Sequence, residues 1–298
     1  MKINICIPVF NEEENLPNFL QTLNEYLKSF SNTKFQLSVV FFDDGSIDNS
    51  LQILEKTDHE VIGVLNNKGL GNAIASLFNH SVEAGVDGVI KLDCDGQMNI
   101  NDIDYFLKQI EENEFDLIQG NRFEKSKNFK LGFFKKVGIL FFRLIFKLLG
   151  MKVKDSSNGF IYVSKKWLEG FKIIGNYNAA QQILLDTKLR NLSYSEISVN
   201  IENRKSGKSF VGIRYPFNVV SSMIALYAYR RTNKLLTIPG IVILFFSLLF
   251  LINDVLLWVK QIEEKVISNQ ITIFMFLIGT QLLSLGLITE FLKKQKNI

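Results

Sequence analysis

Residues 88–97 read GVIKLDCDGQ, and the predicted fold is arranged around them. The apolar first half of this stretch predicts a short buried strand, and its second half places Asp93 and Asp95 in the loop that follows. Open parallel sheets bind their ligands at the carboxyl ends of strands. Residues two apart on an extended backbone point the same way, so both carboxylates can face one ligand.

Two carboxylates beside a polyphosphate suit Mg²⁺ or Mn²⁺, which keep coordination sites for water and phosphate oxygens. The acidic pair therefore indicates a nucleotide-binding site. The competing interpretation is an ordinary acidic loop that caps the next helix, a role that Asn99 or Asn101 can also fill. The segments around the pair decide between these two interpretations.

Strand and helix patterns alternate ahead of the acidic pair. Strands are predicted at residues 3–9, 35–42 and 61–65, and helices at residues 12–30, 51–54 and 73–82. This alternation predicts an α/β fold with a doubly wound, mostly parallel sheet of the Rossmann-like type. Polar residues follow each predicted strand, and they are Asn11 with Glu12, Asp43 with Asp44, residues 66–69, and the acidic pair itself. Parallel strands present these ends at one edge of the sheet, where the polar residues converge.

Size and composition narrow the class of protein. A chain of 298 residues suits one domain of about 200 residues with an appendage. The net charge of +4 is small, and no region combines clustered cations with aromatic residues, so no nucleic-acid partner is expected. His59 and His80 are the only histidines and form no ligand cluster, which argues against a zinc hydrolase.

Two uncharged apolar runs near the end of the chain, residues 235–253 and 271–289, have 19 residues each. At roughly 1.5 Å per residue each reaches about 29 Å, close to the thickness of the bilayer hydrocarbon. Residues 235–298 are therefore expected to form two transmembrane helices, at about 235–258 and 271–292. The flanking cations are Arg230, Arg231, Lys234, Lys293, Lys294 and Lys296, whereas the turn holds Lys260 and Lys265. The positive-inside rule then predicts a multi-pass protein of the cell (inner) membrane with a cytoplasmic N-terminal domain.

Residues 132–150, GFFKKVGILFFRLIFKLLG, are strongly apolar yet carry four cations. At 100° per residue, Lys136, Arg143 and Lys147 lie within about 40° of one another on a helix. Such a helix is typical of a membrane interface, where cations meet lipid phosphates. The alternative is a core helix with one solvated stripe. Residues 215–234 are expected to form a second, juxtamembrane amphipathic segment.

Short motifs extend over roughly residues 1–215. They are PVFNEEE at 8–14, DDGS at 43–46 with Asp48, Gly69-x-Gly71, DxDGQ at 93–97, GNRF at 120–123, NGF at 158–160 and RxxGxS at 204–209. In this order and spacing the chain resembles the family 2 glycosyltransferases, most of all the polyprenyl-phosphate (dolichyl- or undecaprenyl-phosphate) sugar transferases. The resemblance implies a GT-A fold for residues 1–214.

The resemblance also implies roles for individual residues. The implied donor-binding residues are Pro8, Asn11, Glu12, Asp43, Asp44, Asp93, Lys208 and Ser209. Mg²⁺ or Mn²⁺ would be held by Asp93, Asp95 and Gln97. Arg122 would meet the acceptor phosphate, together with Lys135 and Lys136, and Arg204 would close the donor site; Asp95, Arg122 and Arg204 are the implied catalytic residues. Phe210 stands where the family often has lysine, so Lys208 is the candidate for that charge.

The tripeptide Gly207-Lys208-Ser209 also resembles the end of a phosphate-binding P-loop. A P-loop would need a glycine at position 202, where Glu202 stands, and a strand leading into the loop, which is not predicted. The P-loop interpretation is therefore rejected.

The acceptor is predicted from a missing carboxylate. Transfer to a hydroxyl needs a general base, and related enzymes usually carry an acidic residue where this chain reads YNAAQQ, residues 177–182. A phosphate monoester is already anionic at pH 7 and needs only positive groups to hold it. A phosphate acceptor is therefore favoured. Asp186 is either the base of a hydroxyl-directed enzyme or a residue on a solvated helix face.

Together these features predict a membrane-anchored, inverting glycosyltransferase that moves a sugar from a UDP- or GDP-sugar to polyprenyl phosphate. Two alternatives stay open. One is transfer to a lipid or glycan hydroxyl, and the other is a non-catalytic membrane scaffold that binds nucleotide sugar. The intact acidic pair argues against the scaffold. A homo-oligomer is compatible with the sequence.

Overall fold

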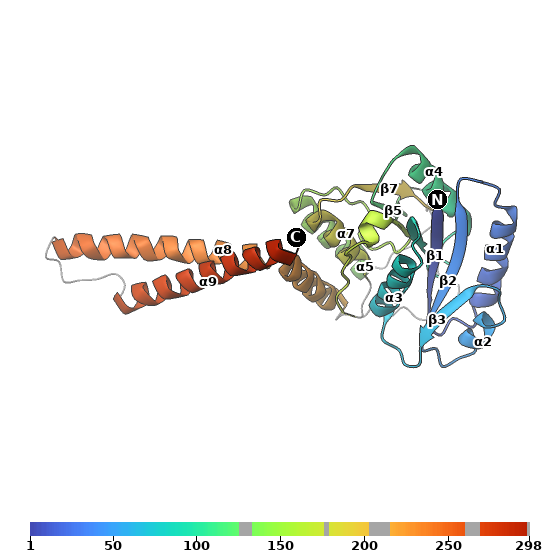
Figure 1. Ribbon diagram of the computed structural model, residues 1–298, viewed down its shortest axis with the longest axis horizontal. Helices are drawn as coiled ribbons and strands as arrows, with labels where there is room; N and C mark the ends of the chain where they lie inside the picture. Colours follow the sequence, from blue (N-terminus) through green and yellow to red (C-terminus); the bar gives the residue numbers. More distant parts are fainter. Residues whose placement is uncertain (125–132, 176–178, 203–214, 260–268, 297–298) are drawn as a thin grey trace. The chain divides into compact units, whose positions relative to one another are not determined.

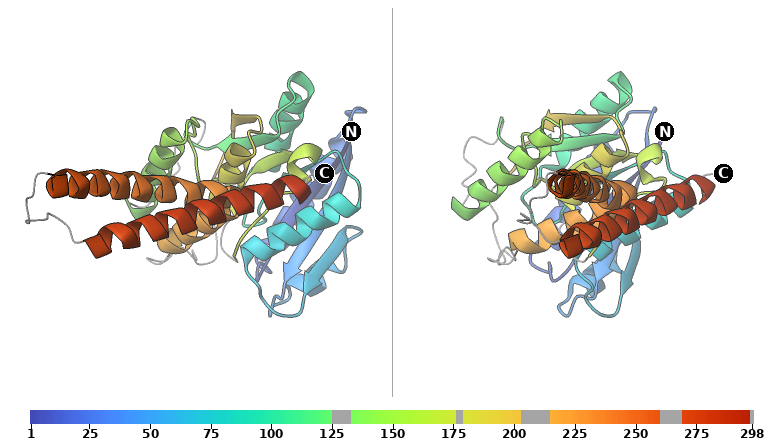
Figure 2. Two further views of the ribbon diagram at one scale, coloured as in Figure 1. Left: turned by 60° about the vertical axis from the view of Figure 1, so that its left-hand side comes forward. Right: turned by 90° about the vertical axis from the view of Figure 1, so that its left-hand side faces the viewer.

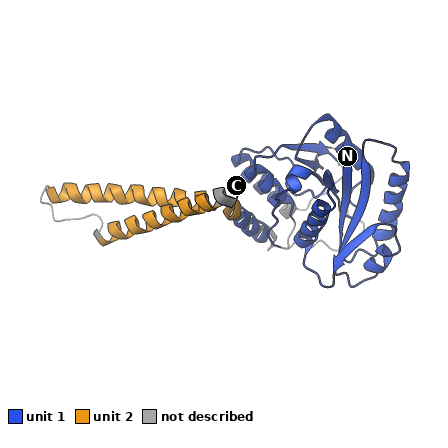
Figure 3. Ribbon diagram, viewed as in Figure 1, with its two compact units in different colours: residues 1–226 blue, residues 227–298 orange. Residues whose placement is uncertain are grey.

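The computed structural model describes residues 1–124, 133–175, 179–202, 215–259 and 269–296. The chain divides into two compact units, residues 1–226 and 227–298 (Figure 3). Each unit is described by itself below.

Unit 1 is built on a seven-stranded sheet of order β3-β2-β1-β4-β6-β5-β7 (Figure 1). The strands are β1 (Lys2–Val9), β2 (Gln36–Asp44), β3 (Glu60–Val64), β4 (Gly88–Lys91), β5 (Leu117–Asn121), β6 (Ile161–Ser164) and β7 (Tyr194–Ser198). Strand β6 runs antiparallel to both neighbours, β4 and β5, and the other adjacent pairs are parallel. The predicted mostly parallel sheet is confirmed.

Helices cover both faces of this sheet (Figures 1 and 2). The described helices of unit 1 are α1 (Leu16–Ser29), α2 (Ser50–Leu54), α3 (Leu70–Glu83), the 3₁₀ helix η1 (Ile100–Asp102), α4 (Ile103–Glu112), α5 (Phe133–Leu148), α6 (Lys165–Leu168), α7 (Ala180–Leu189) and the start of α8 (Tyr215–Val259). Alternate β1 residues such as Ile3 and Ile5 pack with α1 and α4, whereas Cys6 packs with α3, α5 and α7 on the opposite face. Alternation of this kind places a core on each side of the sheet, which confirms the doubly wound fold.

Several predicted boundaries differ from the structure by a few residues, and two of these differences bear on the site. Helix α1 begins at Leu16 rather than at residue 12, because the backbone N–H groups of Asn15 and Leu16 first close a turn on the Glu12 carbonyl. Strand β2 extends to Asp44, because its ladder with β1 and β3 continues to that end. Asp43 and Asp44, both candidate donor-binding residues, therefore belong to strand β2 rather than to the loop after it.

The sheet changes its winding direction between β1 and β4. Their ladder ends at Cys6 opposite Lys91, whereas β1 stays paired with β2 as far as Val9 opposite Asp43. Pro8 lies beyond the last β1–β4 pair, where its missing N–H removes no bond to β4. Strands that part at such a switch point provide the ligand crevice of doubly wound folds.

Unit 2 consists of the later part of α8 and of α9 (Asn269–Lys296), which pack as an antiparallel hairpin. A Cβ atom added to Gly240 would lie 2.8 Å from the Leu283 nitrogen, and one added to Gly286 would lie 2.9 Å from Thr237 Oγ1. Small residues thus let the two backbones approach closely. The stretches 217–259 and 270–292, of 43 and 23 residues, are long and apolar enough to cross a membrane. Helix α8 is interrupted by a non-helical residue, Arg231.

Replacing Gly279 with alanine is expected to destabilise the hairpin by about 1–3 kcal/mol, because its backbone approach leaves no room for a methyl group. The new Cβ would lie 2.7 Å from Leu244 Cγ and 3.1 Å from the Leu244 nitrogen. Gly138→Ala in α5 is the matched control, because nothing lies within 4 Å of its added Cβ. The control should stabilise by up to about 1 kcal/mol. Unfolding midpoints of the detergent-purified protein measure both effects, and shifts of equal sign would contradict the packing described.

Candidate active site

The loops after β1 and β2 are hydrogen-bonded to each other. The Asn11 backbone N–H donates to Ser46 Oγ at 3.0 Å, and Asn11 Oδ1 accepts from the Ile47 N–H at 2.9 Å. The Glu12 N–H donates to Ser50 Oγ at 2.8 Å. Asn11 has a positive φ of 55°, which asparagine tolerates better than most residues. Two of the motifs predicted to bind the donor are therefore brought together.

Asp43 and Asp44, the last residues of β2, are 2% and 3% exposed and hold different partners. Both oxygens of Asp44 accept backbone N–H groups, from Lys68 at 2.9 Å and from Gly69 at 2.7 Å. Asp43 Oδ2 accepts from the Ser46 N–H at 3.1 Å. Asp43 Oδ1 is buried and has no hydrogen-bond partner among the described residues. A buried carboxylate oxygen without a donor is costly, and a ligand N–H or O–H would satisfy it.

The acidic pair follows β4. Lys91 Nζ forms an ion pair with Asp93 Oδ1, and the Lys91 side chain is only 2% exposed whereas that of Asp93 is 30% exposed. Asp95 Oδ1 accepts from the Gln97 N–H at 3.1 Å across a turn in which Gly96 has a φ of 73°. The Asp93 carboxylate is thus paired with the Lys91 ammonium group, a contact that was not predicted from the sequence.

Gln97 connects the acidic loop to a distant segment of the chain. Its Nε2 donates to the Glu202 carbonyl at 3.1 Å, and the Glu202 N–H donates to the Gln97 carbonyl at 2.8 Å. Met98 and Ile201 add an antiparallel bridge. Residue 202 is therefore fixed beside the acidic pair. The predicted residues Arg204, Lys208 and Ser209 follow it and lie outside the described residues, as does the side chain of Lys135.

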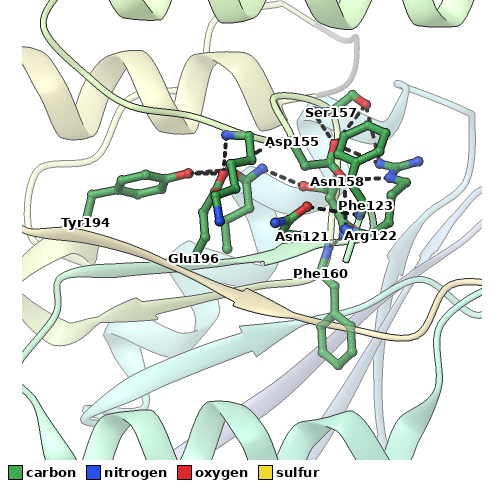
Figure 4. Close-up of polar contacts among 11 residues, drawn as sticks. Asn121, Arg122, Phe123, Asp155, Ser157, Asn158, Phe160, Tyr194 and Glu196 are labelled. Atoms are coloured by element: carbon green, nitrogen blue, oxygen red, sulfur yellow. Dashed lines mark hydrogen bonds and ion pairs between the residues drawn. The ribbon is translucent and has the colours of Figure 1, made fainter. Parts of the chain in front are cut away.

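Arg122, just after β5, is held by a buried carboxylate (Figure 4). Its Nε donates to Asp155 Oδ2 at 2.6 Å and its Nη2 to Asp155 Oδ1 at 3.3 Å, and Nη2 also lies 3.3 Å from Ser157 Oγ. The Asp155 side chain is fully buried and that of Arg122 is 13% exposed. This bidentate ion pair fixes the plane of the Arg122 guanidinium group.

A second layer of hydrogen bonds supports Asp155 from β7 (Figure 4). Glu196 Oε1 accepts from the backbone N–H groups of Lys154 at 2.8 Å and Asp155 at 3.2 Å, and from the Tyr194 hydroxyl at 2.7 Å. Burial and the nearby Glu196 carboxylate raise the pKa of Tyr194 far above its ordinary value. Tyr194 therefore remains a hydrogen-bond donor to Glu196 at neutral pH.

Gly159 lies directly against Asp93, in the same segment whose Asp155 holds Arg122. A Cβ added to Gly159 would lie 2.8 Å from Lys91 Nζ and 3.1 Å from Asp93 Oδ2. The segment 155–160 thus binds Arg122 at its start and contacts the acidic pair through Gly159. The motif NGF owes its glycine to this close approach.

Asp186 is not a residue on a solvated helix face, so that part of the prediction was wrong. It is fully buried in α7 and lies 3.5 Å from Arg190 Nη1, one helical turn further on. Arg190 also donates to the carbonyl oxygens of Trp167, at 2.6 Å, and Glu169, at 2.6 Å. Asp186 therefore belongs to an interior ion pair that joins α7 to the end of α6.

The donor set at the acidic pair fits a magnesium-like ion. Carboxylate oxygens are the hard ligands that Mg²⁺ and Mn²⁺ prefer. Within the described part of the chain, no group of three or more His, Cys, Asp or Glu side chains is arranged to hold a metal ion. Two aspartates that share the ion with phosphate oxygens of a substrate would suffice for such a site.

Residues 4–171 match the family described as Glycosyl transferase family 2. The chain belongs to glycosyl transferase family 2. This family 2 glycosyltransferase is 27% identical over 309 residues to an undecaprenyl-phosphate 4-deoxy-4-formamido-L-arabinose transferase of Proteus mirabilis, a match that covers 99% of this chain and 90% of the relative. It is 28% identical over 181 residues to a bactoprenol glucosyl transferase of Shigella phage SfV, covering 60% of this chain and 57% of the phage enzyme.

Solved structures share the fold of this family 2 glycosyltransferase. Glucosyl-3-phosphoglycerate synthase from Mycobacterium tuberculosis, in complex with Mn²⁺, uridine diphosphate and glucosyl-3-phosphoglycerate, has a TM-score of 0.56 at 13% identity. The match covers 77% of this chain and 79% of the synthase. A complex of that synthase with Mg²⁺ and uridine diphosphate gives the same TM-score and identity. The GT-A fold expected from the sequence is confirmed.

Four residues of the glycosyltransferase site were missed from the sequence: Lys91, Asp155, Tyr194 and Glu196. Only Lys91 carried a visible signal, because a lysine inside an apolar strand must find a partner when it is buried. Asp155, Tyr194 and Glu196 lie in no recognisable sequence motif, and they are hydrogen-bonded into the site only in the folded protein.

Proposed function

We propose that this family 2 glycosyltransferase moves a sugar, with inversion, from a UDP- or GDP-sugar to polyprenyl phosphate at the cytoplasmic leaflet of the cell membrane. The observation that carries the proposal is the segment 155–160, which holds Arg122 at one end and contacts Asp93 at the other. One short segment thereby contacts both a cation suited to an acceptor phosphate and the acidic pair of the donor site.

The donor would lie where β1 and β4 part. Asp43 Oδ1 would accept a hydrogen bond from the base or ribose, next to Pro8, Asn11 and Glu12. Asp44 holds the loop at Lys68 and Gly69 in place, and the second lone pair of either of its oxygens would accept a hydrogen bond from the donor.

Asp93 and Asp95 would hold Mg²⁺ or Mn²⁺, and Gln97 would offer its Oε1, because the amide nitrogen is only a donor and here donates to the Glu202 carbonyl. When bound, such an ion neutralises the charge that develops on the leaving diphosphate. Arg204 follows Glu202 by two residues in the sequence. Arg204, Lys208 and Ser209 are proposed to close over the phosphates and limit hydrolysis.

The acceptor phosphate would be held by Arg122, with Lys135 and Lys136 nearby in sequence on α5. No general base is needed for a phosphate that is already anionic. Asp186, the alternative base, is engaged by Arg190 in the interior, which supports the phosphate acceptor. The two relatives, an undecaprenyl-phosphate sugar transferase and a bactoprenol glucosyl transferase, support the same choice.

Helix α5 presents a face suited to a membrane surface. Ile139, Phe142 and Phe146 pack into the core, whereas the leucines Leu140, Leu144 and Leu148 are 60%, 57% and 79% exposed. The cations Lys136, Arg143 and Lys147 are exposed as well. Leucines that enter the acyl region beside cations at the headgroups are the mark of an interfacial helix. The hairpin of α8 and α9 would anchor the protein in the membrane that holds the lipid acceptor.

The proposal is tested by incubating membranes that contain the protein with a panel of labelled UDP- and GDP-sugars, followed by extraction with organic solvent. Label that enters the lipid fraction and is released by mild acid is the expected result. Label that resists mild acid would indicate transfer to a hydroxyl. Asp186→Asn should then abolish transfer, whereas a phosphate-directed enzyme should keep its activity in proportion to the folded protein. Binding of nucleotide sugar without any turnover would favour the scaffold.

A further inference from the structure

Lys91 is the final residue of β4 and is enclosed by the sheet. It pairs with Cys6 of β1 on one side and with Ile161 of β6 on the other. Its side chain is 2% exposed, and its Nζ contacts Asp93 Oδ1. An ammonium group removed from water is tolerated only when it is paired and hydrogen-bonded. The Asp93 carboxylate is therefore the partner that offsets the cost of burying the Lys91 side chain.

The same contact changes what Asp93 can offer a ligand. One of its two oxygens is engaged by Lys91, and Gly159 leaves the space in which the ammonium and the other oxygen lie. Lys91, Asp93 and Asp95 together carry a net charge of about −1, instead of the −2 of two aspartates alone. A divalent cation is attracted less strongly to such a site than to a bare acidic pair.

We propose that Lys91 is a positioning residue of the donor site, which fixes the Asp93 carboxylate and weakens the binding of a divalent cation until a nucleotide diphosphate supplies further negative charge. The inference rests on the proposed function, because it takes the acidic pair as the donor's metal site. The cation would then enter and leave together with the nucleotide. Such coupling would favour release of the nucleotide product with its ion after each transfer.

The test compares Lys91→Met with the wild type by titrating Mn²⁺ against the purified full chain in detergent and following the spin-resonance signal of free Mn²⁺. Without nucleotide, K91M is expected to bind Mn²⁺ about tenfold more tightly, the effect of a unit charge several ångströms from a dication under water-like screening. With UDP or GDP present the gain should shrink, since the lost ammonium also attracts the diphosphate. Lys34→Met is the matched control, because it breaks an exposed pair with Glu111 and should leave Mn²⁺ affinity unchanged.

Mn²⁺ affinity in K91M that equals or falls below that of the wild type would overturn the inference, since a merely structural lysine would change stability alone. Should K91M fail to fold, the same titration on Lys91→Gln decides the outcome. Sugar transfer by the wild type with no change of Mn²⁺ affinity in the variant would refute the role of Lys91 and leave the proposed function standing. A tenfold gain in affinity without transfer to any prenyl phosphate would support the role and refute the acceptor.

Discussion

Replacing Asp95 with asparagine is expected to lower the rate of sugar transfer by roughly 10²- to 10³-fold, the usual cost of removing one group that stabilises charge in the transition state. Asparagine keeps the shape of the side chain, and its Oδ1 can still accept the Gln97 N–H that shapes the turn. The fold should therefore survive, and the loss should reflect the missing negative charge on the ion. Asp93 cannot replace it, because one of its oxygens is engaged by Lys91.

The rate is measured as transfer of labelled sugar to polyprenyl phosphate at saturating donor, over a range of Mn²⁺ concentrations. Asp58→Asn is the control, because this exposed aspartate precedes β3 and lies at the opposite end of the strands from the acidic pair. It should transfer at the wild-type rate. A D95N protein that also transfers at that rate, without added Mn²⁺, would remove the acidic pair from the mechanism.

The fold could be predicted because its signals are local. Periodicity and strand-end chemistry identified the first four strands and the three helices that connect them. The insertion of β6 between β4 and β5 could not be predicted, since a four-residue strand such as Ile161–Ser164 pairs with partners fixed only by the whole sheet. The extension of β2 to Asp44 was missed for a similar reason. Asp43 and Asp44 can be buried at the end of the strand only because the backbone N–H groups of Ser46 and Lys68, in two separate loops, donate to their carboxylates.

The candidate site was predictable as a set of residue types but not as a set of contacts. Parallel strands bring their carboxyl ends together, so Asn11, Asp43 and Asp93 could be assigned to one edge of the sheet. The contact of Arg122 with Asp155 joins residues 33 apart and has no local pattern. Asp186 was different, since its spacing of four residues to Arg190 on a helix is a pairing signal that the sequence already contained.

Replacing Arg122 with glutamine is expected to affect both the fold and the acceptor. Asp155 would keep a charge in a fully buried position, and removing one partner of such a pair costs about 3–5 kcal/mol of unfolding free energy. R122Q alone therefore cannot separate a structural role from a catalytic one. The double variant Arg122→Gln with Asp155→Asn removes both charges, so it should recover most of the lost stability in chemical denaturation.

The double variant is the decisive protein for the acceptor. It should remain folded yet bind polyprenyl phosphate roughly ten- to hundredfold more weakly, because a hydrogen bond to a charged group is worth about 1.5–3 kcal/mol. The apparent KM for the lipid should rise while the KM for the nucleotide sugar stays close to that of the wild type, since Asp43, Asp93 and Asp95 are untouched. Lys108→Gln, which removes an exposed cation on α4, controls for the loss of charge. If the folded double variant used polyprenyl phosphate as well as the wild type does, Arg122 would serve only to hold Asp155, and the acceptor phosphate would have to be bound by other cations.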